Sequence, residues 1–311
     1  MKWIRNFLTT IFCVAAMQTA DAATICVYDP GGKSGDYYRL VENMTLEAVS
    51  WGVKAEVKAY TDEATAVNDY QAKKCDGVLA TGVRLQRFNN FPTTIEAIGA
   101  LPDYSHLRYM LKTLTRAGAA KKLVKGEHET AGIISIGAVY LFVRNRNIDT
   151  VSELSGKRIA AFDYDVPSIT MVDRVGAIMV PADLGTLGPK FNNGDVDACY
   201  VSAPVYGPFE LKKGLGSSGG IVRLPLAQAT LQLLVRTESF PSDFGTKSRQ
   251  YFYDQFDHTI ELVKKAEAGI PKKYWIELPA DSMPGFDELF QASRITLRDK
   301  GAYDKKMLKV M

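Results

Sequence analysis

Two long β-branched runs constrain the fold of this 311-residue chain more than any other feature. Residues 130–145 read TAGIISIGAVYLFVRN and residues 229–240 read ATLQLLVRTESF, and both exceed the common strand length of about five or six residues. They bracket a segment in which strand and helix patterns alternate. Two extended segments on either side of an inserted α/β unit indicate two strands that cross between two lobes.

Both sides of the first run carry an α/β pattern. Strand–helix alternation at these lengths favours parallel βαβ units. The strand patterns lie at 23–29, 53–60, 75–82, 156–163, 177–182 and 197–203. In the first half, helical patterns start at Ser34 and at Thr61, which is the expected cap of the second helix.

The last part of the chain consists of long amphipathic helical patterns. Their apolar stripes, at 252–263 and 286–297, are typical of core-facing surfaces. We predict an α/β fold in which 23–135 and 237–311 form the first lobe and 136–236 form the second lobe.

The N-terminus follows the plan of a secretory signal peptide. Residues 1–22 have a basic start, an apolar run from Phe7 to Met17, and small residues at Ala20 and Ala22. This run is shorter than the roughly 20 residues that span a bilayer, which disfavours a retained membrane anchor. We predict cleavage after Ala22 and export of a soluble protein to the periplasm. The net charge of +3 gives no argument for a nucleic-acid partner.

The mature chain would keep three cysteines in an oxidising compartment, which permits disulfides. Cys26 and Cys75 lie in two strand patterns. If these strands are neighbours, a bridge would close a loop of about 50 residues and contribute roughly 4 kcal/mol. Cys199 is expected to be a buried free thiol. The alternative to the bridge is that all three cysteines are reduced and lie in the core.

The stretch GGKSG at 31–35 looks like a phosphate-binding loop. A P-loop would need its first glycine at position 27, which is Val27 in a strand pattern. The loop nevertheless follows the first strand and precedes a helix, where ligands of α/β sheets bind. A ligand loop and a tight turn, in which glycines only supply positive φ, remain equal alternatives.

Catalytic motifs are sparse. The three histidines lie far apart, and no nucleophile elbow, zinc-binding pair or Cys-x-x-Cys occurs. Asp163, Tyr164 and Asp165 follow a strand pattern and could bind a metal or an ammonium group, cap the next helix, or supply a hydrolytic carboxylate pair. We therefore predict no catalytic residue, no metal and no cofactor.

Several segments resemble the substrate-binding subunits of TRAP-type transporters, the DctP-like family. The matching motifs are Asn145-Arg146, Leu154 to Ile159, Val175-Gly176-Ala177 and Asn193 to Asp197. The chain is most similar to a divergent AdeT-like group, through CVYDPGGKSGDYY, KCDGV and SRQYFYDQFDHTIELVKKAEAGIPKKYW. The resemblance implies a type II periplasmic binding protein with two lobes that close on a small molecule, and a membrane permease as partner.

The resemblance also implies that the usual ligand contacts are missing. The family's carboxylate-clamping arginine falls on Ala160, a second arginine falls near Tyr140, and a ligand-binding asparagine falls near Val201 or Ser202. A neutral or cationic ligand is therefore favoured over a dicarboxylate, which would face uncompensated aspartates.

The residues expected around the cleft are aromatic, polar and acidic. We predict that the ligand contacts come from Tyr28, Asp29, Lys33, Ser34, Asp36, Thr81, Arg84, Tyr140, Asp163, Tyr164, Asp165, Ser202 and Tyr206. In this prediction GGKSG is the ligand loop of the first lobe, and the helix from Ser34 directs its N-terminus into the cleft. Tyrosines bind rings or cations, and carboxylates pair with amines. About half of these acids are expected to face solvent or cap helices instead.

Three functions compete on this sequence. The leading prediction is a monomeric periplasmic solute-binding protein that performs no chemistry. An exported hydrolase would require a carboxylate pair with shifted pKa values in the cleft. An interaction or sensor protein would use the lobes as a surface for an envelope partner, and a closed or filled cleft would favour it.

Overall fold

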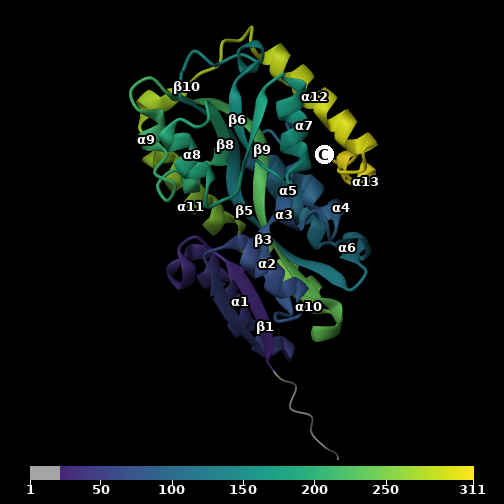
Figure 1. Cartoon of the computed structure of the whole chain (residues 1–311). Helices are drawn as coiled ribbons and strands as arrows, with labels where there is room; N and C mark the ends of the chain where they lie inside the picture. Colours follow the sequence, from purple (N-terminus) through teal and green to yellow (C-terminus); the bar gives the residue numbers. More distant parts are fainter. Residues whose placement is uncertain (1–21) are drawn as a thin grey trace, which may run out of the picture.

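The computed structural model describes residues 22–311, whose strands form one 10-stranded mixed sheet (Figure 1). Eight strands follow the order β2-β1-β3-β9-β5-β8-β6-β7, while β10 pairs with β9 and β4 pairs with β5. The strands are β1 (Ala23–Tyr28), β2 (Ala55–Tyr60), β3 (Gly77–Thr81), β4 (Val124–Lys125), β5 (His128–Val143), β6 (Arg158–Phe162), β7 (Ile178–Ala182), β8 (Ala198–Ser202), β9 (Gly220–Arg236) and β10 (Trp275–Ile276). Below, the part around β1, β2 and β3 is the first lobe, and the part around β6, β7 and β8 is the second lobe.

The two long strands, β5 and β9, are antiparallel neighbours that belong to both lobes. The end of β9 pairs with β3 of the first lobe, and the end of β5 pairs with β8 of the second lobe. The strands within each lobe are parallel to one another, as βαβ units require. The predicted two-lobed α/β fold with two crossover strands is confirmed.

β9 starts at Gly220, earlier than the expected position 229. The register between β5 and β9 shifts between Val139 and Leu141, opposite a stretch of β9 that contains Pro225. A proline cannot donate to a strand ladder, so it interrupts the pattern from which a strand is predicted. A second shift separates Ser135 from Gly137, whose φ of 98° favours glycine.

Helices pack around both lobes, as Figure 1 shows for α1, α2 and α10 beside β1 and β3, and for α7, α8 and α9 around β6 and β8. The helices are α1 (Asp36–Ala48), α2 (Glu63–Gln71), α3 (Gly82–Leu85), α4 (Asn90–Thr93), α5 (Tyr104–Thr115), α6 (Ala117–Leu123), α7 (Val166–Arg174), α8 (Leu187–Asn193), α9 (Lys212–Leu215), α10 (Phe244–Asp254), α11 (Phe256–Gly269), α12 (Met283–Asp299) and α13 (Lys305–Leu308).

Three helix boundaries differ from the sequence prediction. α1 begins at Asp36 rather than at Ser34. α2 is capped by Asp62 rather than Thr61, because the Asp62 carboxylate accepts hydrogen bonds from the Thr65 N–H at 2.7 Å and the Thr65 hydroxyl at 2.5 Å. The apolar stripe at 252–263 is divided between α10 and α11 by a break at Gln255.

The C-terminal helices pack on different lobes. Phe244 and Phe252 of α10 lie in the first-lobe core. Phe286 and Leu289 of α12 share a core with Ile159 of β6, and α12 contacts α7. The predicted division of the chain, with 23–135 plus 237–311 as the first lobe and 136–236 as the second lobe, stays a prediction. These contacts favour a different division, in which α12 belongs to the second lobe.

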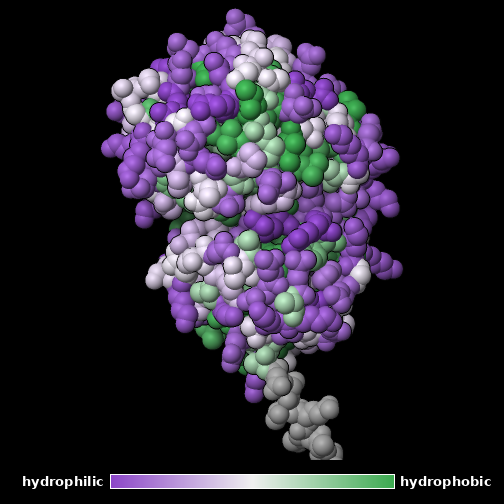
Figure 2. Space-filling view, in the orientation of Figure 1, coloured by the Kyte–Doolittle hydropathy of each residue, from purple (hydrophilic) through white to green (hydrophobic). Residues whose placement is uncertain are grey.

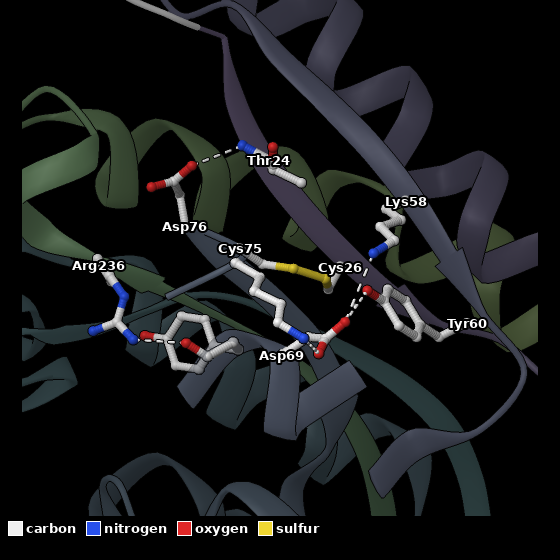
Figure 3. The surroundings of a disulfide bond; sticks show 10 residues. Thr24, Cys26, Lys58, Tyr60, Asp69, Cys75, Asp76 and Arg236 are labelled. Carbon is white, nitrogen blue, oxygen red and sulfur yellow. Dashed lines mark hydrogen bonds and ion pairs between the residues drawn. A yellow bond between two sulfur atoms is a disulfide. The ribbon is translucent and has the colours of Figure 1, made fainter. Parts of the chain in front are cut away.

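A disulfide joins two strands of the first lobe (Figure 3). Cys26 of β1 and Cys75, just before β3, have Cα atoms 5.9 Å apart and are buried in the first-lobe core. Beside the bridge, Asp76 accepts a hydrogen bond from the Thr24 N–H at 2.8 Å. The predicted bridge is confirmed, and Cys199 is a buried free thiol.

Most of the surface in Figure 2 is hydrophilic, and hydrophobic side chains gather over β6 and α7. Within residues 22–311, no helix has the length and apolar composition needed to cross a bilayer. The predicted signal peptide, 1–22, lies outside the described residues except for Ala22.

Candidate functional site

A cavity of about 140 Å³ lies between the lobes, against the crossover strands. Thr81, Phe162 and Ser202, the last residues of β3, β6 and β8, all line it. Ligands of α/β sheets bind beyond the carboxyl ends of the strands, so the fold itself directs a binding site to this place. Most of the wall is apolar, with Ile136, Val139, Pro167, Met171, Leu184, Val201, Val205 and Leu226 among its residues.

Glu96 brings a carboxylate to the cavity from the short 3-10 helix η3 (Thr94–Glu96). Its Oε1 accepts hydrogen bonds from the Thr230 N–H at 2.7 Å and the Thr230 hydroxyl at 2.5 Å. Burial raises the pKa of Glu96 to about 8; the bonds from Thr230 oppose this rise, and the negative charge of Asp165 adds to it. Gly82 makes room for the side chain, because a Cβ there would overlap the carboxylate.

Asp165 is a second carboxyl group at the cavity, and it comes from the second lobe. It caps α7, accepting hydrogen bonds from the Ser168 N–H at 3.1 Å and from the Ser168 hydroxyl. Burial raises its pKa, while the bonds from Ser168 lower it. Of the roles open to Asp165 from sequence, the structure shows the helix cap.

Three buried polar atoms of cavity-lining residues have no hydrogen-bond partner among residues 22–311. They are the Thr81 Oγ1, the Tyr200 hydroxyl oxygen and the Gln228 Oε1. The Gln228 side chain is only 1% exposed, and its Nε2 donates to the Leu101 carbonyl at 3.2 Å. Buried polar groups are nearly always satisfied, so these three atoms mark a place for a polar partner.

Three side chains connect the lobes beside the cavity. Arg84 of α3 donates from Nε to Glu63 Oε2 at 2.5 Å, and its guanidinium lies 3.8 Å from the centre of the Tyr164 ring. The Tyr164 hydroxyl donates to the same Glu63 oxygen at 3.4 Å. Glu63 is buried and Arg84 is mostly shielded, and both belong to the first lobe. The cation–π contact and the Tyr164–Glu63 hydrogen bond therefore connect the two lobes.

A wider recess of about 580 Å³ opens next to the cavity. Tyr28 and Arg84 line it from the first lobe, and Asp183 and Lys213 line it from the second lobe. Leu184 borders both this recess and the cavity. The recess is therefore a polar approach to the apolar cavity.

The GGKSG loop is organised around Asp29. The buried Asp29 carboxylate accepts hydrogen bonds from the N–H groups of Gly31 at 2.7 Å, Tyr37 at 3.0 Å and Tyr38 at 3.1 Å. It thus satisfies free N–H groups at the start of α1 and complements the positive end of the helix dipole. These contacts favour the tight-turn alternative over a ligand loop.

Replacing Gly35 with alanine is expected to lower the free energy of unfolding by about 2 kcal/mol, because the new Cβ would overlap the Asp29 carboxylate and displace it. Urea denaturation measures this effect. Gly118→Ala is the control, since nothing lies within 4 Å of a Cβ there. Equal stability of the two variants would contradict this role of Asp29.

The other predicted site residues separate into groups. Thr81, Asp165 and Ser202 meet at the cavity, while Tyr28, Arg84 and Tyr164 lie at the recess or the contact between lobes. Exposed positions are those of Lys33, Ser34, Asp36 and Asp163. Neither Tyr140 nor Tyr206 lines the cavity, and the Tyr140 hydroxyl donates to Glu267 at 2.9 Å.

The sequence prediction missed Glu96, Gln228 and Thr230. A signal for two of them exists, because Gln228, Thr230 and Gln232 place polar side chains at every second position of an apolar strand, and each is 1% exposed. A row of buried polar groups on one face of a strand needs partners. Glu96 follows no such pattern, and only the tertiary structure places it.

Solved periplasmic solute-binding proteins of TRAP systems share this fold. One from Desulfovibrio desulfuricans, with bound sn-glycerol-3-phosphate, matches with a TM-score of 0.75 and 13% sequence identity over 93% of this chain and 95% of that chain. One from Desulfovibrio salexigens, with bound orotic acid, has a TM-score of 0.74 and 15% identity over 93% of this chain and 96% of that chain. At these identities the likeness shows the fold alone.

Sequence similarity is higher to two proteins of Acinetobacter baumannii. "Probable solute-binding protein AdeT1" is 39% identical over 282 residues, which cover 91% of this chain and 93% of that protein. "Probable solute-binding protein AdeT2" is 26% identical over 216 residues, covering 69% of this chain and 90% of that protein. The family model described as "Solute-binding protein AdeT 1/2" matches residues 40–311. The chain therefore belongs to the AdeT 1/2 family of solute-binding proteins.

Proposed function

We propose that the mature protein captures a small solute in the cavity between its lobes and delivers it to a TRAP-like membrane permease. The observation that carries this proposal is the cavity at the ends of β3, β6 and β8, with unpaired polar atoms on Thr81, Tyr200 and Gln228. Family membership supports the binding role. The permease as partner is suggested by the TRAP proteins that share the fold.

The solute is proposed to be neutral or cationic. Within residues 22–311, the cavity wall contains no lysine, arginine or histidine. The resemblance aligns Ala160 with the family's arginine; this residue is fully buried in β6 and does not itself line the cavity. A dicarboxylate would face Glu96 and Asp165 without a compensating charge.

Export as a monomer to the periplasm completes the proposal. β1 starts at Ala23, so a cut after Ala22 would leave every strand of the sheet intact. The periplasmic origin of the structural relatives and the Cys26–Cys75 disulfide support an oxidising compartment.

An exported hydrolase is the second candidate, because Glu96 and Asp165 form the carboxyl pair with raised pKa values that such an enzyme would need. Two arguments weigh against it. Both carboxyl groups are engaged, by Thr230 and by Ser168. A cavity of about 140 Å³ is also close to one that holds a single benzene, of about 150 Å³, so two linked sugar rings would not fit. Turnover of a chromogenic glycoside would establish the hydrolase.

A thermal-shift screen of acids, amines and neutral solutes, followed by native mass spectrometry, tests the proposed function. A solute at a hundredfold excess over its dissociation constant is expected to stabilise the mature protein by about 2.7 kcal/mol. Ala227→Leu is expected to abolish this stabilisation, because Ala227 lines the cavity. Ala117→Leu is the control, since Ala117 is exposed on α6.

The proposed function fails if no solute stabilises the wild-type protein, and this result would favour an interaction or sensor protein. A solute that stabilises wild type and Ala227→Leu equally would also contradict it, because binding would then lie outside the cavity.

A further inference from the structure

We propose that the cavity binds a small apolar amine, whose ammonium group is held by Glu96 and Gln228. This inference rests on the proposed function and names the class of solute. Three independent features of the cavity carry it: its size, the hydrogen-bonding character of its polar groups, and the absence of basic side chains in its wall among the described residues.

The size of the cavity limits the solute to a single ring or a short branched chain. Its volume is about 140 Å³, and a cavity of about 150 Å³ in another protein binds one benzene. The apolar wall, with side chains such as Ile136, Met171 and Leu226, suits a hydrocarbon body.

Two polar groups of the cavity wall supply acceptors for a hydrogen-bond donor on the solute, while the unpaired Thr81 and Tyr200 hydroxyls can donate or accept. The two groups are Glu96 and Gln228, and Thr230, which binds Glu96, is two residues from Gln228 and therefore on the same face of β9. The Gln228 Nε2 is engaged by the Leu101 carbonyl, so the unpaired atom of this amide is its oxygen, an acceptor. A carboxylate and an amide oxygen in the wall of one cavity match the donors of an ammonium group.

The charged side chains that act on Glu96 are acidic. Asp165 faces it from the second lobe and Glu63 from α2, and both raise its pKa. Arg84 is already paired with Glu63. The Tyr303 hydroxyl accepts a hydrogen bond from the Ile98 N–H at 3.2 Å. Tyr303 is uncharged at neutral pH, and burial raises its pKa further. A cationic solute would therefore supply the charge that the cavity wall lacks.

A pH dependence follows from the raised pKa of Glu96. An ammonium group favours the ionised carboxylate, so binding must lower this pKa. Affinity is then weak while the carboxyl group is protonated and increases as pH rises toward about 8. An alkylamine with a pKa near 10 stays protonated over this range. A neutral solute of the same shape should show no such increase.

Calorimetry with three probes of one shape tests the inference: benzylamine, benzyl alcohol and benzoate, each at pH 6.5 and pH 8.0. Benzylamine is expected to bind the wild-type mature protein more tightly than the others, and roughly tenfold more tightly at pH 8.0 than at pH 6.5. Glu96→Gln should weaken benzylamine binding about ten- to a hundredfold and remove the pH dependence, but leave benzyl alcohol unaffected.

Glu42→Gln is the matched control, because Glu42 is exposed on α1. If Glu96→Gln does not fold, the change of benzylamine affinity with pH in the wild-type protein still tests whether the cavity binds an amine. Benzoate binding more tightly than benzylamine, or benzylamine affinity that does not change with pH, would overturn the amine inference and leave solute capture standing. The proposed function itself fails if the wider screen finds no solute, or if a solute stabilises the wild-type protein and Ala227→Leu equally.

Discussion

Replacing both Cys26 and Cys75 with alanine is expected to lower the free energy of unfolding by about 4 kcal/mol. The disulfide joins residues separated by 49 positions, so the unfolded chain has far fewer conformations with the disulfide than without it. Both residues are buried between β1 and β3, and alanine avoids burying a hydroxyl there. Urea denaturation of the two proteins measures the difference.

The slope of this denaturation curve gives a second readout. The unfolded variant, without its cross-link, exposes more surface, so its m-value should rise. Cys199→Ala is the control, since it removes a buried thiol that closes no loop. A loss of less than about 1 kcal/mol, with an unchanged m-value, would contradict the loop-closure explanation.

Replacing Arg249 with methionine is expected to cost about 3–5 kcal/mol, because it leaves Glu129 largely buried without its partner. Arg249 of α10 donates from Nη1 to Glu129 Oε1 at 2.6 Å and to the Thr130 carbonyl at 3.0 Å. Their side chains are only 3% and 13% exposed. Gly245 lets the carboxylate approach α10, because a Cβ there would overlap it.

Two further variants separate the pair from simple loss of packing. Arg249→Met combined with Glu129→Met removes both charges and should recover much of the lost stability. Arg108→Met breaks the exposed pair with Asp257 and should cost less than about 1 kcal/mol. If Arg249→Met were as stable as the double variant, the loss would not come from an unpaired buried charge on Glu129.

The fold was largely predictable from sequence, because its signals are local. The run at 130–145 carries a strand pattern along its whole length, and β5 occupies most of it. β9 begins at Gly220 with Pro225 inside it, and a proline conceals a strand from any pattern of alternation. The packing of α12 on α7 depends on which apolar faces meet, and periodicity within one helix cannot show this.

The candidate site was predictable only in part. Thr81 and Ser202 lie at the cavity because they end strands, and strand ends can be located from sequence. Asp29 directly follows β1, yet its carboxylate turns back to bind the start of α1. Glu96 lies in the cavity because Thr230, 134 positions away, fixes its carboxylate, and no local pattern records such a contact.

The continuous pairing of β5 with β9 bears on how the protein can move. No flexible linker separates the lobes here, since the two strands stay paired from His128–Arg236 to Val143–Gly220. The register shifts at Gly132, Gly137 and Leu141 are the places where a paired ribbon can bend, because a bulge already accommodates extra twist. The angle between the lobes can therefore change by bending at these shifts, while the β5–β9 hydrogen bonds on either side of them are kept. Opening would then bend a continuous sheet, and it would not require a flexible linker.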